Sequence, residues 1–234
     1  MSGKRDLKGD RVVITEKDSY GRIKANGPFL SEVTFDFEEL KVNGSAKIEE
    51  DASGADIKIN GKCTVEARLT VERLKINGTF NGTELEIFDY GKINGKTSAE
   101  RIVGPGDLKI NGKCFCDSIT NIGSLKINGG GEVEHIEAKE IVINIGSDSS
   151  FGKIKAEGHI YIGHGEEHHL GQRFFRKLIS EHKGIAEIEE IQTRGIVELD
   201  HCKVEKVYAK ELFIGEECEI GEFIEIELDI EDLG

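Results

Sequence analysis

The chain has little of what a compact globular protein uses to fill its core. Its 234 residues include no tryptophan, four tyrosines and only two prolines. A thick core normally contains more aromatic side chains, whereas the thin core of a solenoid is filled one coil at a time. The composition therefore favours an elongated repeat architecture over a globule.

Positive charge and long apolar runs are also lacking. The net charge of −14 argues against binding to nucleic acid and against simple electrostatic attachment to anionic lipid. No segment approaches the roughly 18 apolar residues of a membrane span, and no apolar run follows Met1 as in a signal peptide. The odd number of cysteines and the absence of a CxxC pair indicate reduced thiols, most of them facing inward. We expect a cytoplasmic protein, with a peripheral position at the inner membrane as the alternative.

The motifs of common enzymes are missing as well. There is no P-loop, no nucleophile elbow and no obvious group of aspartates on one face. His164 and His168 have the spacing of a zinc pair on a helix, but no HExxH motif accompanies them. We therefore predict a protein that is not an enzyme, with no catalytic residue, cofactor or metal site.

What the chain does contain is an Ile-Asn-Gly motif that returns every 17 residues. A lysine stands two positions before each asparagine, and an apolar residue, mostly β-branched, stands one position before it. A fixed period of this length indicates a repeat architecture. The asparagines that are each followed by glycine are Asn26, Asn43, Asn60, Asn77, Asn94, Asn111 and Asn128.

Within each repeat, apolar and polar residues alternate, which is the pattern of strands and not of helices. We predict a parallel β-helix of about twelve coils, with neighbouring coils about 4.8 Å apart. Asn-Gly would form a corner, where asparagine tolerates a left-handed backbone and stacks into an amide ladder. After Asn128 the spacing suggests a step of 18, with Gly146 in the place of asparagine.

The predicted fold is thus all-β, with one inserted amphipathic helix. Residues 1–20 are an N-terminal segment, 21–163 and 185–234 are coils, and 164–184 are a helical insertion. Its apolar face is expected to pack on a flank of the rod, with a membrane or partner contact as the alternative. That face comprises Leu170, Phe174, Phe175 and Leu178.

Two columns of charge run along the predicted rod, about half a coil apart. The lysine stripe comprises Lys24, Lys41, Lys58, Lys75, Lys92, Lys109 and Lys126. The acidic column comprises Glu32, Glu49, Glu66, Glu100, Asp117 and Glu134. Both suit solvated edges that prevent wrong sheet pairing. The sharper hypothesis is lateral association of rods, with the basic face of one against the acidic face of the next.

The coil resembles that of the bactofilins, a family of polymer-forming bacterial cytoskeletal proteins. The resemblance rests on Leu-Lys-Ile/Val-Asn-Gly at 40–44, 74–78, 108–112 and 125–129. It implies a right-handed β-helix, nucleotide-independent filaments, and a scaffold role in cell shape, motility or protein localisation. The chain departs from the family in having no proline-rich tails and in carrying the insertion. It looks closer to the longer, Bacillus-like members, for which motility is the natural expectation.

The ends of a β-helix expose unpaired backbone and apolar core, so rods can join into an open filament. We predict an end-to-end interface formed by Val12, Val13, Phe223, Ile226, Leu228 and Ile230. The partners would be further copies of the chain, a related paralogue or client proteins; a membrane surface is not indicated. The alternatives are a β-helical enzyme resembling an acyltransferase or lyase, and a module whose lysine stripe binds an anionic polymer.

Overall fold

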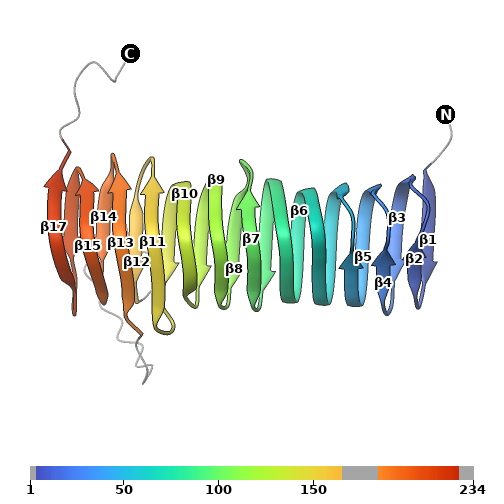
Figure 1. Ribbon diagram of the computed structural model, residues 1–234, viewed down its shortest axis with the longest axis horizontal. Coiled ribbons are helices and arrows are strands. Elements are labelled where there is room, and N and C mark those ends of the chain that lie inside the picture. Colours follow the sequence, from blue (N-terminus) through green and yellow to red (C-terminus); the bar gives the residue numbers. More distant parts are fainter. Residues whose placement is uncertain (1–3, 165–183, 227–234) are drawn as a thin grey trace, which may run out of the picture.

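Parallel strand pairing joins the described part of the chain into a rod of about twelve coils. The computed structural model describes residues 4–164 and 184–226. β1 lies at one end of the rod and β17 at the other (Figure 1). The described residues form no helix, and so none that could span a membrane.

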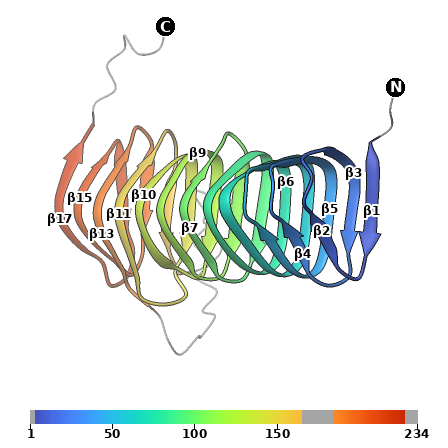
Figure 2. The ribbon, with the colours of Figure 1, turned by 45° about the vertical axis from the view of Figure 1, so that its right-hand side comes forward.

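Seventeen strands follow one another along the chain. They are β1 (Arg5–Gly9), β2 (Val12–Ile14), β3 (Ser19–Ala25), β4 (Phe29–Ser31), β5 (Phe35–Ile48), β6 (Ala52–Asn94), β7 (Thr97–Val103), β8 (Asp107–Asn111), β9 (Cys114–Asn128), β10 (Gly131–Asn144), β11 (Ser149–Ala156), β12 (Ile160–Gly163), β13 (Ala186–Thr193), β14 (Ile196–Leu199), β15 (Cys202–Ala209), β16 (Glu211–Ile214) and β17 (Glu219–Glu225). The longest strand, β6, continues through several corners without a break. Figure 2 shows how the ribbon winds around the rod.

Each coil has three straight segments, and each segment directs two side chains inward. In the coil that spans β4 and the first half of β5, the six inward residues are all buried. They are Phe29, Ser31, Phe35, Phe37, Leu40 and Val42. Identical positions stack from coil to coil, for example Leu40 on Ile57 and Val42 on Ile59. Each coil therefore contributes only six side chains to the core. Such a thin core needs few aromatic residues, in agreement with the composition.

The predicted amide ladder is confirmed. The Nδ2 of each asparagine donates to the Oδ1 of the asparagine one coil earlier, from Asn60 on Asn43 to Asn144 on Asn128. The six donor–acceptor distances lie between 2.6 and 2.8 Å. The Oδ1 of Asn144 has no partner among the described residues, because glycine (Gly163) occupies the ladder position in the next coil.

The positive φ expected from the Asn-Gly turn lies on the glycine, and the ladder asparagines do not adopt the left-handed backbone that we expected them to tolerate. Gly61, Gly78 and Gly95 have φ angles of 140°, 143° and 142°. A Cβ atom on Gly61 would lie 2.1 Å from the carbonyl oxygen of Gly44, in the preceding coil. The corner therefore needs glycine for its φ angle and for the close approach of the backbone below.

Two boundaries also differ from the sequence-based expectation. β1 already pairs with β3, with Leu7 beside Ile23, so the coils begin at Arg5 and not at residue 21. Asn144, and not Gly146, pairs with Asn128. The coil between them is one residue shorter than the period, and the asparagine ladder continues through this change of length.

The solenoid is continuous across the segment predicted as a helical insertion. Ile162 of β12 pairs directly with Leu199 of β14, although 37 residues separate them. At the base, the Nε2 of His164 lies 2.8 Å from the carbonyl oxygen of Gly184, so the chain leaves and returns at one place. The predicted helix face with Leu170, Phe174, Phe175 and Leu178 lies outside the described residues.

Candidate assembly surfaces

The C-terminal end of the rod exposes side chains that belong to core columns. Phe223 of β17 stacks on Val207, and Ile214 of β16 stacks on Leu199. Val207 and Leu199 are buried, whereas Phe223 is 42% exposed and Ile214 is 56% exposed. The last coil therefore offers apolar surface that a further coil would cover.

The outer side of this coil has no pairing partner in the part of the chain that the structure describes. Among the described strands, β17 pairs only with β15, whereas β15 pairs with both β13 and β17. Ile226 continues the pairing, and its N–H donates to the carbonyl of Ala209 at 3.0 Å. Its side chain is half-buried, and Leu228 and Ile230 lie outside the described residues. An open strand edge of this kind is a template for another strand.

The N-terminal end is better covered. In the first coil, Val12 and Ile14 are buried, and Leu7 is half-buried. Val13 is 40% exposed, but it points to the flank, in the same outward column as Leu30. Val12 and Val13 thus expose little apolar surface at this end, so the C-terminal end is the stronger candidate for the end-to-end interface, which stays a prediction.

The lysine stripe lies on one flat face of the rod, with its members stacked in register. Lys24 pairs with Lys41 and Lys41 with Lys58, and near the middle Lys92, Lys109 and Lys126 stack in the same way. Lys41 forms an ion pair with Glu39. In the part of the chain that the structure describes, four consecutive members form no ion pair. They are Lys58, Lys75, Lys92 and Lys109.

The acidic column runs along a corner of the rod, and its charge is only partly balanced. Lys47 bridges Glu49 and Glu66 at 2.6 and 3.0 Å. Further along, the acidic residues line an open groove of about 810 Å³. Carboxylates lining this groove are Glu100, Asp117, Glu132, Glu134 and Glu189, accompanied by His135 and Lys153. The two charged surfaces are thus separate stripes, about half a coil apart.

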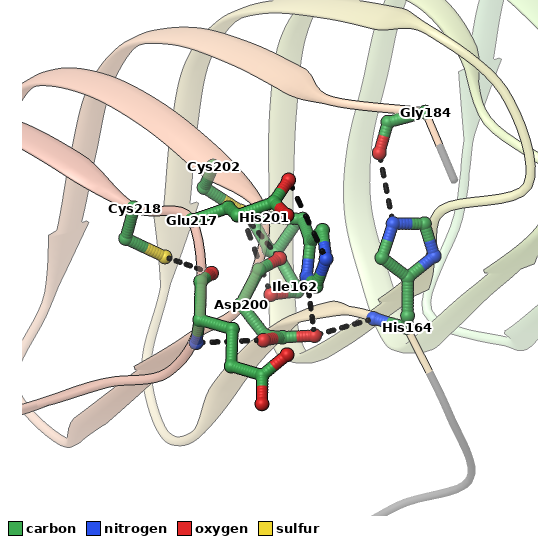
Figure 3. Close-up of polar contacts among 9 residues, drawn as sticks. Ile162, His164, Gly184, Asp200, His201, Cys202, Glu217 and Cys218 are labelled. Carbon is green, nitrogen blue, oxygen red and sulfur yellow. Dashed lines mark hydrogen bonds and ion pairs between the residues drawn. The ribbon is translucent and has the colours of Figure 1, made fainter. Parts of the chain in front are cut away.

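A buried polar corner near the C-terminal end was not anticipated from the sequence. Asp200 takes the ladder position of asparagine, and its carboxylate accepts from the N–H groups of His164 at 3.3 Å and Glu216 at 2.9 Å (Figure 3). His201 replaces the corner glycine, with a φ of 56° and 1% exposure. Its Nδ1 lies 2.9 Å from Asp200 Oδ2, and its ring meets that of His164 edge-on at 4.4 Å.

This corner replaces Asn-Gly by Asp-His at the end of the first coil after the insertion, in contact with His164 at the base of the insertion. The dipeptide could have been recognised as a corner only with the insertion length known, because the period is lost there. Among residues 4–164 and 184–226, no group of histidine, cysteine and carboxylate side chains is arranged to hold a metal ion. His168 lies outside these residues.

Comparison of the chain with protein-family models, with curated proteins and with solved structures gave no match. The candidate functional surfaces therefore rest on the geometry of the rod itself. They are the open C-terminal end, the lysine stripe and the acidic column.

Proposed function

We propose that this protein is a non-enzymatic scaffold whose rods join end to end into filaments without a nucleotide. The observation that carries the proposal is the uncovered last coil, where Phe223 and Ile214 continue buried core columns into solvent. A second rod placed on this end would bury both side chains and pair the free edge of β17. Burial of apolar side chains and pairing of strand edges are also the interactions that hold successive coils together.

The resemblance of the 17-residue coil to bactofilins supports the same proposal. It further implies right-handed winding, filament formation in the cytoplasm or at the inner membrane, and a role in cell shape, motility or the localisation of client proteins. A contact through an end propagates along the rod axis, so an assembly of such rods is an open filament or, if only one end joins, a dimer of rods.

Electron microscopy of the purified protein, without nucleotide and over a range of salt concentrations, tests this proposal. Residues 211–226 contain six glutamates and no lysine or arginine, so charge repulsion opposes contacts at this end. Salt screens that repulsion and leaves apolar burial intact. We expect assemblies longer than one rod that persist or lengthen as salt rises. Single rods at every salt and protein concentration would contradict the proposal.

We propose lateral bundling as a second property, carried by the four stacked lysines that have no ion pair among the described residues. The acidic column of another rod offers the matching charge and the same repeat spacing. Bundles should separate into thin filaments as salt rises, which is the opposite of the end contact. Lys75→Gln with Lys92→Gln should weaken bundling, whereas Lys203→Gln, near the C-terminal end and outside the stripe, should not. Bundles that are indifferent to both salt and the stripe variants would refute this second proposal.

A further inference from the structure

Two cysteines lie one above the other in the last two coils. Cys202 begins β15, and the register of the next residues, Lys203 beside Glu219, places Cys218 next to it in the following coil. Both are free thiols in the same inward column; Cys202 is buried and Cys218 is half-exposed. Cys63 and Cys114 belong to this column too, but the coils of Phe80 and Thr97 separate them.

The geometry of the pair suits a disulfide. Neighbouring residues on adjacent strands are about 4.8 Å apart, within the Cα separation of about 4.4–6.8 Å that a disulfide spans. Each sulfur lies near the carbonyl oxygen two residues earlier, Cys202 Sγ at 3.3 Å from Asp200 and Cys218 Sγ at 3.4 Å from Glu216. The two side chains thus point the same way (Figure 3). Cys218 lies just outside β17, where the backbone can adjust.

The two thiols also differ in exposure and in the direction in which their pKa values are shifted. A hydrogen bond from the Cys202 thiol lowers the pKa of Cys218, although burial and the nearby Asp200 act in the opposite direction. The same contact and burial raise the pKa of Cys202, which therefore stays a thiol. Cys218 is the half-exposed and more acidic member, and Cys202 is a partner protected from solvent.

We propose that Cys218 and Cys202 form a peroxide-sensitive pair that closes into a disulfide between the last two coils. The Cys218 thiolate attacks a hydroperoxide, the O–O bond breaks, and a sulfenic acid and hydroxide (or alkoxide) result. The Cys202 sulfur then displaces the sulfenic oxygen, which leaves as water with the thiol proton. The two sulfurs lose two electrons in total, and the peroxide gains them. The inference does not depend on filament formation.

The disulfide would tie the open end of the rod to its interior. The closed loop contains β15 and β16, including Ile214, and it ends one residue before β17, which carries Phe223. Among the described strands, the terminal coil pairs with one other coil alone, through β15 and β14. Oxidation is therefore expected to slow amide exchange in β16 and β17 and to leave β5 unchanged.

Peptide mapping of the full chain tests the proposal. Trypsin cleaves after Lys203, Lys206 and Lys210, so residues 195–203 and 211–234 separate unless a disulfide joins them. After dilute reduced protein is treated with hydrogen peroxide and blocked with N-ethylmaleimide, we expect the joined pair as the main cysteine product. It should disappear on reduction and in Cys218→Ser, whereas Cys114→Ser should still form it.

Three results would overturn the proposal. The first is that both peptides remain blocked as free thiols after peroxide treatment that oxidises other cysteines. The second is that Cys218 accumulates as sulfinic acid with Cys202 still reduced. The third is that the linked peptides come only from covalent dimers, which a non-reducing gel separates from monomers before digestion. Because the wild-type chain gives the decisive signal, the test does not depend on whether a Cys202→Ser variant folds.

Discussion

The amide of Asn94 lies in the middle of the corner ladder. It donates to Asn77 at 2.7 Å and accepts from Asn111 at 2.6 Å. Asn94→Ala removes both hydrogen bonds, so the half-buried side chains of Asn77 and Asn111 each lose one hydrogen-bond partner. We expect a loss of about 1–3 kcal/mol in the free energy of unfolding, since each such bond contributes about 0.5–1.5 kcal/mol net. Urea denaturation followed by circular dichroism measures it.

Two asparagines serve as controls for this variant. Asn43 stands at the end of the ladder and takes part in one bond, so Asn43→Ala should cost about half as much. Asn81 faces the groove and makes no side-chain hydrogen bond among the described residues, so Asn81→Ala should change stability by less than about 0.5 kcal/mol. Equal losses at all three positions would show that the ladder has no special role.

The glycine beside each ladder asparagine has a different task. A Cβ on Gly95 would lie 2.0 Å from the carbonyl oxygen of Gly78, and its φ of 142° is one that other residues avoid. We expect Gly95→Ala to destabilise the rod by at least about 2 kcal/mol, because strain at such an angle adds to the clash. Gly158→Ala, whose Cβ would approach no atom closer than 3.3 Å, is the matched control. Equal thermal unfolding midpoints for the two variants would contradict this account.

At this scale the sequence allowed the amide ladder to be predicted, because stacking follows directly from a constant period. It did not indicate which residue of Asn-Gly takes the unusual backbone, since both tolerate positive φ angles. The close approach of Gly44 to Gly61 decides that question, and it is visible only when two coils are stacked. The Asp200–His201 corner escaped prediction because a single Asp-His pair has no repeat to identify it.

At the scale of elements, the strand alternation predicted the inward columns well. Leu40, Ile57 and Leu74 are buried, as are Phe29 and Cys63. The errors fell where the period changes. The first coil lacks the Asn-Gly corner, so the sequence pattern does not identify Arg5–Gly9 as part of the rod. The coil before Asn144 is one residue shorter than the period, so the pattern indicates the wrong register there.

The base of the insertion leads to a prediction about the coils on either side of it. His164 and Gly184 are in hydrogen-bond contact, and β12 pairs with β14 across the gap. Replacing residues 165–183 by a short glycine-serine linker should leave the rod intact. The linker has to join only His164 to Gly184, and these two residues are already in contact. Circular dichroism and thermal unfolding should match the parent chain closely. Loss of the β signal, or a midpoint lower by more than a few degrees, would show that the solenoid needs the segment.

For the whole molecule, the two ends of the rod are unequal. The first coil buries Val12 and Ile14, whereas the last coil exposes Ile214 and Phe223. Sequence reasoning located the apolar residues of both ends but could not rank them, because exposure depends on what covers each coil. If rods join only through their C-terminal ends, the product is a dimer of two rods. Its length, twice that of one rod, distinguishes it from a filament.

Sedimentation velocity of matched arginine variants tests whether the rods join through their C-terminal ends. Phe223 is 42% exposed at the end of the rod, and Phe88 is 49% exposed in β6, away from both ends. Both variants place one charge on an exposed aromatic position, so they differ in location alone. We predict that Phe88→Arg sediments as assemblies like the parent protein and that Phe223→Arg sediments as single rods. Assemblies of unchanged size for Phe223→Arg, or single rods for both variants, would contradict an interface at the C-terminal end.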